Sequence, residues 1–200
     1  MKPFDGLEEF LGAFAPPVTP RLLYQRLMAR EKKLPPKRQD QKPAFRINYA
    51  EGPMGFLLSH IVKRMAAAGW PATVHALYRS PAEQNAAKAR GASKASAYHS
   101  PHQFYEAGDV VHKTLFWDAP QEFWDTLAIV SRQVANDFGV PLELGYDWGW
   151  DSAHVEIKGW REVRRRQKVT HTPTKLELDL RFKELLPKQF ETRLSQKGSF

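Results

Sequence analysis

The stretch SPHQFYEAGDVV, residues 100–111, places a histidine and an aspartate seven positions apart across a short irregular segment. Its last residues have the small and β-branched character of a strand that begins near Asp109. His102 is therefore expected in a loop and Asp109 at the start of a strand. A histidine and a carboxylate placed in this way can share a metal ion when a third ligand lies nearby in the fold.

Helical and strand-like patterns follow one another on both sides of this stretch. Helices are expected where apolar residues recur at helical spacing or where an N-cap, proline and glycine mark the ends, at residues 54–68, 81–90 and 121–138. Strands are expected at residues 72–78, 107–113 and 153–158. The segment KLELDLRFKELL, residues 175–186, fits either a strand or a helix. This order predicts an α+β fold, a small sheet with helices packed on it.

Composition excludes several classes of site. With 200 residues, 42% of them hydrophobic, the chain is long enough for one domain with a core. It contains no cysteine, which excludes disulfides, thiolate nucleophiles and cysteine zinc sites and leaves histidine and carboxylate as the strong metal ligands. The first residues, MKPFDGLEEFLGAF, carry acids where a signal peptide needs an apolar run, and no window approaches a membrane span. We therefore expect a protein made in the cytoplasm without a signal peptide or transmembrane segment.

The net charge of +8 is concentrated at the two ends of the chain. Residues 1–45 hold nine Lys and Arg against five acids, and residues 158–200 hold twelve against five, whereas residues 46–157 hold nine against twelve. We expect a basic, Pro-rich N-terminal arm at 1–45 with one short helical stretch, a folded domain at 46–160 and a basic C-terminal extension at 161–200. The flanks are expected to be accessory, either as solubilising tails or as contacts to an anionic polymer. They lack the clustered aromatics and basic stripe of a specific nucleic-acid-binding face.

A third candidate ligand, His154, lies in the last expected strand. If this strand neighbours the one that begins near Asp109, the two residues and His102 meet at one sheet edge. Catalytic zinc sites use three such ligands and leave the fourth position to water. His99 and His112 flank the site and are the alternative ligands. Asp151, three residues before His154, is close enough to take a proton from the attacking water.

Three motifs, in this order, resemble those of the M15 family of zinc peptidases, which includes D-Ala-D-Ala carboxypeptidases and dipeptidases and phage L-alanyl-D-glutamate endolysins. The first is Tyr78-Arg79-Ser80 followed by Gln84, the second is the pattern S-x-H-x-x-G-x-A-x-D at residues 100–109, and the third is a Trp-rich stretch leading to Asp151-Ser-Ala-His154. The resemblance covers about residues 54–160. One position departs from the pattern, because Tyr105 replaces the usual glycine and Gly108 lies just before the aspartate. Either the turn differs here, or Gly108 takes over some of the freedom.

The resemblance implies a small antiparallel sheet with packed helices and a zinc site at the sheet edge, as in the hedgehog-like DD-peptidase fold. It implies that zinc is bound by His102, Asp109 and His154. Asp151 would act as the base and Arg79 would stabilise the oxyanion, although an arginine before a helix is also an ordinary surface residue. Residues expected to bind substrate or to position ligands are Gln84, Ser100 and Trp148. Trp148 and Trp150 fit a core role equally well, and Glu156 is expected to support His154 from the same strand face.

The function implied by the resemblance is that of a zinc metallopeptidase that hydrolyses peptidoglycan stem peptides, either a phage-type endolysin or a DD-carboxypeptidase. Such an enzyme acts at the cell wall, in phage lysis or in virion-associated release. Endopeptidase and carboxypeptidase members share these residues, so the bond that is cleaved stays open. Two other classes remain: a non-catalytic, zinc-containing cell-wall-binding module of the same fold, and a structural or nucleic-acid-associated protein acting through its basic flanks.

Overall fold

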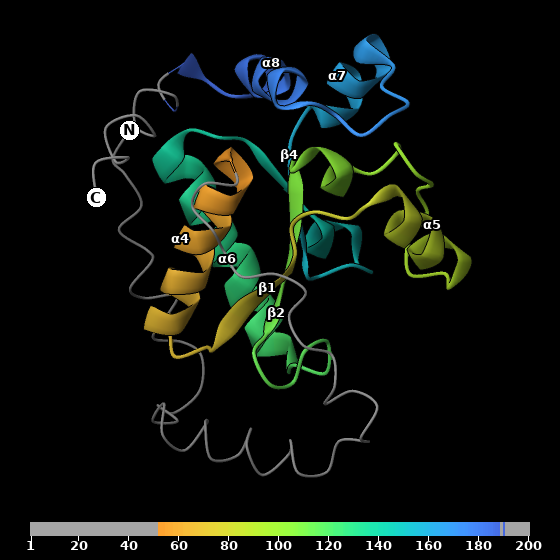
Figure 1. The fold of residues 1–200 in the computed structure, drawn as a ribbon. Helices are drawn as coiled ribbons and strands as arrows, with labels where there is room; N and C mark the ends of the chain where they lie inside the picture. Colours follow the sequence, from red (N-terminus) through yellow and green to blue (C-terminus); the bar gives the residue numbers. More distant parts are fainter. Residues whose placement is uncertain (1–51, 189, 191–200) are drawn as a thin grey trace. The chain divides into compact units, whose positions relative to one another are not determined.

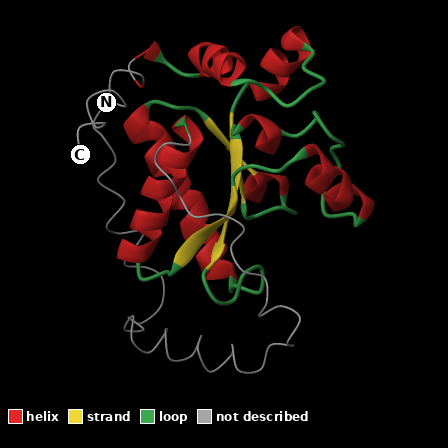
Figure 2. Ribbon diagram, in the orientation of Figure 1, coloured by secondary structure: helices red, strands yellow, loops and turns green. Residues whose placement is uncertain are grey.

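A four-stranded antiparallel sheet, which carries Asp109 and His154, lies in the part of the chain that the computed structural model describes, residues 52–188 and 190. Figures 1 and 2 show its strands between helices. The strands are β1 (Ala72–Ala76), β2 (Ala107–His112), β3 (Leu142–Leu144) and β4 (His154–Ile157), in the spatial order β1-β2-β4-β3. The prediction of an α+β fold with a small antiparallel sheet is confirmed. The expected N-terminal arm, residues 1–45, and its helical stretch at 21–33 lie outside the described residues.

Two long helices, α4 (Pro53–Ala67) and α6 (Gln121–Phe138), lie against each other, and α4 also contacts β1 and β2 (Figure 1). The first seven residues of α4 are all buried, and the buried residues of α6 recur at the spacing of an amphipathic helix. In α4 and α6 these include Leu57, Leu58, Ile61, Met65, Phe123, Leu127 and Val134. Gly139 ends α6 in the left-handed conformation, with φ 66°. None of the described helices is long and apolar enough to cross a membrane.

The remaining helices are short and lie mostly in the loops around the sheet. They are α5 (Pro81–Ala89), η2 (Pro101–Phe104), η3 (Gly145–Trp148), α7 (Trp160–Gln167) and α8 (Lys175–Leu185). α5 starts with the expected capping box, in which the Ser80 side chain accepts the N–H of Glu83. The segment that fits either a strand or a helix is helical, because Thr174 and Glu177 form a second capping box at the start of α8. The sequence patterns did not predict β3 or α7.

Tyr105 and Gly108 meet two different structural requirements. Tyr105 adopts a left-handed backbone conformation, and Gly108 leaves room for a packed side chain. Tyr105 ends η2 in the left-handed conformation, with φ 55° and ψ 32°, which costs a non-glycine residue about 1–2 kcal/mol. Its ring stacks on Tyr78 at a centroid distance of 4.8 Å, a contact that contributes about 0.5–1.5 kcal/mol. Gly108 has no positive φ, so of the two alternatives the one in which Gly108 supplies the freedom of the turn is excluded. A Cβ at Gly108 would lie 2.4 Å from Cδ1 of Leu58, so this residue is small because α4 packs on the strand there.

The segment after residue 160 supplies side chains to the core of the described structure. Arg181 is fully buried and forms an ion pair with Glu106, which is also fully buried. Phe190 packs edge-on against Phe56 and Phe138 at centroid distances of 5.8 and 6.1 Å. Side-chain packing therefore continues across the expected domain boundary at residue 160. The division into a domain and a C-terminal extension stays a proposal.

These contacts predict that a fragment of residues 46–160 is less stable than one of residues 46–200. The shorter fragment leaves the carboxylate of Glu106 buried without its partner, and breaking a buried pair in this way costs about 3–5 kcal/mol. Thermal unfolding of the two fragments, followed by circular dichroism, measures the difference. Equal unfolding midpoints would instead support a purely accessory extension.

Candidate metal centre

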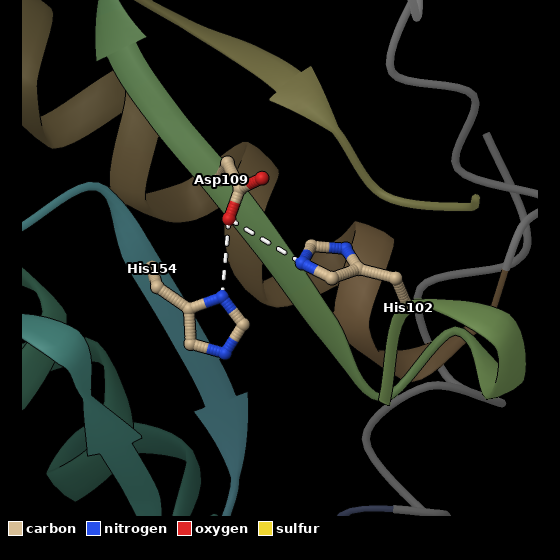
Figure 3. A group of neighbouring side chains, drawn as sticks. All are labelled: His102, Asp109 and His154. Atoms are coloured by element: carbon tan, nitrogen blue, oxygen red, sulfur yellow. Dashed lines mark hydrogen bonds and ion pairs between the residues drawn. The ribbon is translucent and has the colours of Figure 1, made fainter. Parts of the chain in front are cut away.

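Three side chains converge where β2 and β4 pair. Asp109 of β2 lies directly opposite His154, the first residue of β4, and His102 reaches them from η2. Oδ1 of Asp109 lies 3.1 Å from Nδ1 of His154 and 3.4 Å from Nε2 of His102 (Figure 3). One potential ligand atom from each residue lies within 4.8 Å of the others. The structure thus brings together the three ligands expected from the sequence.

The second nitrogen of each histidine ring has its own partner. Nδ1 of His102 lies 3.4 Å from the carbonyl oxygen of Leu77, and Nε2 of His154 lies 3.1 Å from Oε2 of Glu156. Histidines that bind metals usually donate their other N–H to a carbonyl or carboxylate, which sets the tautomer and the ring orientation. Glu156 is buried and also accepts a hydrogen bond from Arg161 at 2.6 Å. Its expected role as support for His154 agrees with these contacts.

The charges of the three residues depend on one another. Burial lowers the pKa of His154, but hydrogen bonds to Asp109 and Glu156 outweigh burial and raise it to about 9. Burial raises the pKa of Asp109, but the neighbouring His102 and His154 outweigh burial and hold it well below its usual range. Burial lowers the pKa of His102 and favours its neutral form. These shifts favour the anion of Asp109 and the neutral form of His102, the states in which both bind metals, whereas His154, with its raised pKa, has to release a proton before it can bind one.

The spacing of the donor atoms fits a tetrahedral zinc ion. Zinc bonds to nitrogen and oxygen of about 2.0–2.2 Å place neighbouring ligand atoms roughly 3.3–3.6 Å apart in a tetrahedron. The two separations around Asp109, 3.1 and 3.4 Å, lie within a few tenths of an ångström of this range, and the donor atoms of the two histidines lie within 4.8 Å of each other. Two imidazoles and one carboxylate also form a donor set typical of catalytic zinc. The residues present therefore fit the metal that the sequence motifs imply.

Arg79 and Gln84 lie beside this group and are bonded to each other. Nη2 of Arg79 donates to Oδ2 of Asp109 at 3.1 Å, and its Nη1 donates to Oε1 of Gln84 at 3.1 Å. The amide of Gln84 donates in turn to Oγ of Ser93 and to the carbonyl of Ala95. Gln84 is fully buried, so a role as a solvated helix residue is excluded. It holds Arg79 and the loop after α5 in place.

Asp151 lies in the turn that leads into β4. Its carbonyl oxygen accepts the N–H of His154 at 3.0 Å, and its charge interacts with those of Asp109 and His154. Partial burial and the negative charge of Asp109 raise the pKa of Asp151. The turn packs so closely on η3 that a Cβ at Gly145 would lie 2.1 Å from the Asp151 carbonyl oxygen. Glycine at position 145 is therefore needed for the turn that carries Asp151, and the sequence patterns did not indicate this.

An aromatic pair continues from His154 towards the surface. The ring of Trp148 lies 5.3 Å from that of His154 and stacks on Trp150 at 5.6 Å. Trp150 is 55% exposed and carries Nζ of Lys94 4.3 Å from its ring centroid. A core role for Trp150 is therefore excluded, and Lys94, to which the sequence patterns gave no role, contacts it. Ser100, also expected near the site, is buried just before η2.

The two alternative histidines lie outside the ligand group. His99 is exposed, and its Nδ1 lies 2.8 Å from the carbonyl of Ala97. Nδ1 of His112 accepts the backbone N–H groups of Thr114 and Leu115 at 3.2 and 3.1 Å. Among the described residues, the only such group of histidines and acids is that of His102, Asp109 and His154.

Comparison with solved structures shows a likeness to a bacterial endopeptidase. No family model matches the chain, and no curated protein matches it. Among solved structures, the crystal structure of the Serratia marcescens L-Ala D-Glu endopeptidase ChiX is similar over 56% of this chain and 82% of that chain, with 22% sequence identity and a TM-score of 0.43. A likeness at this level does not show an activity of this chain.

Proposed function

We propose that this chain is a zinc-dependent peptidase that hydrolyses peptide bonds in bacterial peptidoglycan stem peptides, as a phage-type endolysin or a DD-carboxypeptidase. The observation that carries the proposal is the convergence of His102, Asp109 and His154, with Asp151 and Arg79 beside them. Ligands, base and cation come from three separate segments, in the order of the M15-like motifs. The class of substrate follows from the resemblance of those motifs.

In this proposal zinc, when bound by the three ligands, polarises the peptide carbonyl and lowers the pKa of the attacking water. Asp151 accepts the proton of that water and delivers it to the leaving amine, as a general base that then acts as an acid. Arg79 supplies positive charge where the carbonyl oxygen becomes negative. Through its bond to Oδ2 of Asp109 it also leaves Oδ1 directed at the histidines. Glu156 and the Leu77 carbonyl keep the two imidazole rings in orientation.

The purified wild-type protein is expected to contain one zinc ion per chain and to cleave soluble muropeptides. Elemental analysis measures the zinc, and mass spectrometry of the products identifies the cleaved bond and so distinguishes an endopeptidase from a carboxypeptidase. Chelation should abolish cleavage and added zinc should restore it, because the proposed reaction needs the ion. Zinc binding without cleavage of any muropeptide, together with retention on isolated cell walls, would favour the binding module. A protein that neither binds zinc nor cleaves would contradict the proposal.

A further inference from the structure

A buried ion pair links α8 to the segment that carries two of the candidate ligands. Nε and Nη2 of Arg181 donate to the two carboxylate oxygens of Glu106 at 2.6 and 2.8 Å, and both side chains are fully buried. Nη1 of Arg181 donates to Oε1 of Gln167 at 2.8 Å, and its guanidinium carbon lies 4.1 Å from the ring centroid of Phe104. All three nitrogens of the Arg181 side chain thus donate hydrogen bonds, which fix the position and orientation of its guanidinium group.

Glu106 is connected to all three segments that carry ligands. It lies immediately before β2, and its backbone N–H donates to the carbonyl of Pro101, at the start of η2, at 3.1 Å. Its carbonyl accepts the N–H of Ile157, at the end of β4, at 2.8 Å. A shift of Glu106 would therefore move η2, β2 and β4 relative to one another, and each of them carries one candidate ligand.

Net stability is a weak explanation for this pair. Removing two charges from water costs so much that well-packed apolar residues of similar volume often replace a buried pair without loss of stability. A bidentate ion pair is directional, whereas apolar packing is not. Its two parallel hydrogen bonds fix both the position and the orientation of the carboxylate. Flexible apolar side chains fill the same volume in several arrangements.

We propose that Arg181 is a positioning residue for the metal centre, which it orients through Glu106, so that docking of α8 and binding of zinc favour each other. The role of Arg181 rests on the proposed zinc site. It assigns a function to α8, which lies beyond the region of the motifs that ends near residue 160. Linkage makes the coupling reciprocal. Zinc should strengthen the docking of α8, and loss of the pair should weaken the binding of zinc.

The test uses the full-length double variant Glu106→Met/Arg181→Met, which removes both charges together and leaves no unpaired ion in the core. Competition with a chromophoric chelator measures the zinc dissociation constant of the folded protein. The expected result is a dissociation constant about tenfold higher than that of the wild type, within the roughly 5- to 150-fold range of coupling between separate sites. Lys183→Met, which removes an exposed charge from the same helix, is the control and should stay within about twofold.

Thermal unfolding of the zinc-free proteins separates positioning from stability. A merely structural pair would change the unfolding midpoint and leave the zinc affinity of the folded double variant unchanged, and that result would overturn the proposal. If the double variant does not fold, hydrogen exchange of α8 in the wild-type protein with and without zinc decides. Slower exchange with zinc is expected, and equal exchange would overturn the coupling. Failure of the wild-type protein to bind zinc would instead contradict the proposed function itself.

Discussion

The Asp151→Asn protein is expected to keep its fold and its zinc and to turn over a muropeptide at least about a hundredfold more slowly than the wild type, since general-base assistance contributes roughly 10²- to 10⁴-fold. Asparagine preserves the size of the side chain and most of its hydrogen bonding but cannot accept the proton of the attacking water. The backbone bond from His154 to the Asp151 carbonyl is unaffected by this change, so the turn before β4 should persist.

Turnover per bound zinc is the quantity to compare, because it separates a base from a residue that merely orients a ligand. An orienting role predicts weaker zinc binding, with the remaining activity proportional to zinc content. Asp147→Asn is the matched control, since Asp147 lies four residues earlier, in η3, and pairs with Arg132 in an exposed position. Equal turnover per zinc in wild type and Asp151→Asn would reject Asp151 as the base.

Replacing His102 by alanine is expected to yield a protein that purifies largely without zinc and has no measurable peptidase activity. The variant loses one of three protein donors, and its zinc affinity should fall by more than the roughly 10- to 100-fold that the loss of a ligand's hydrogen-bond partner costs. Elemental analysis and chelator competition measure the effect. His99→Ala is the control, because His99 is exposed and lies outside the ligand group. Full zinc content in the His102 variant would contradict the ligand assignment.

The arrangement of the candidate ligands could be predicted because it depends on strand register and on residue types that are rare in strands. Asp109 lies within β2 and His154 begins β4, and antiparallel pairing of these strands places the two residues opposite each other. Strong local signals also placed α5, with its capping box, and α6, with its terminal glycine. The two helices depend on neighbours in the chain, so local sequence patterns were sufficient for them, whereas the ligand group was implied by the order of the motifs.

The features that were missed depend on contacts between distant segments or on elements too short to show a pattern. β3 has three residues, fewer than an alternation needs. The burial of Gln84 follows from its bonds to the loop after α5, and that loop has no periodicity. In the sequence Arg181 looks like one more charge of a basic tail. It is a core residue because α8 docks and brings it into contact with Glu106, 75 positions away in the chain. The capping box at Thr174 and Glu177 was a readable signal for α8.

The different requirements at Tyr105 and Gly108 have a consequence for substitution. The constraint at position 105 is on backbone conformation, and a glycine there would meet it at once, so the tyrosine can be replaced if the stack on Tyr78 is given up. The constraint at position 108 is steric, because even a methyl group there would require the side chain of Leu58 to move. Glycine can therefore replace Tyr105 without any other change, whereas a larger residue at 108 requires a smaller side chain at position 58 of the facing helix.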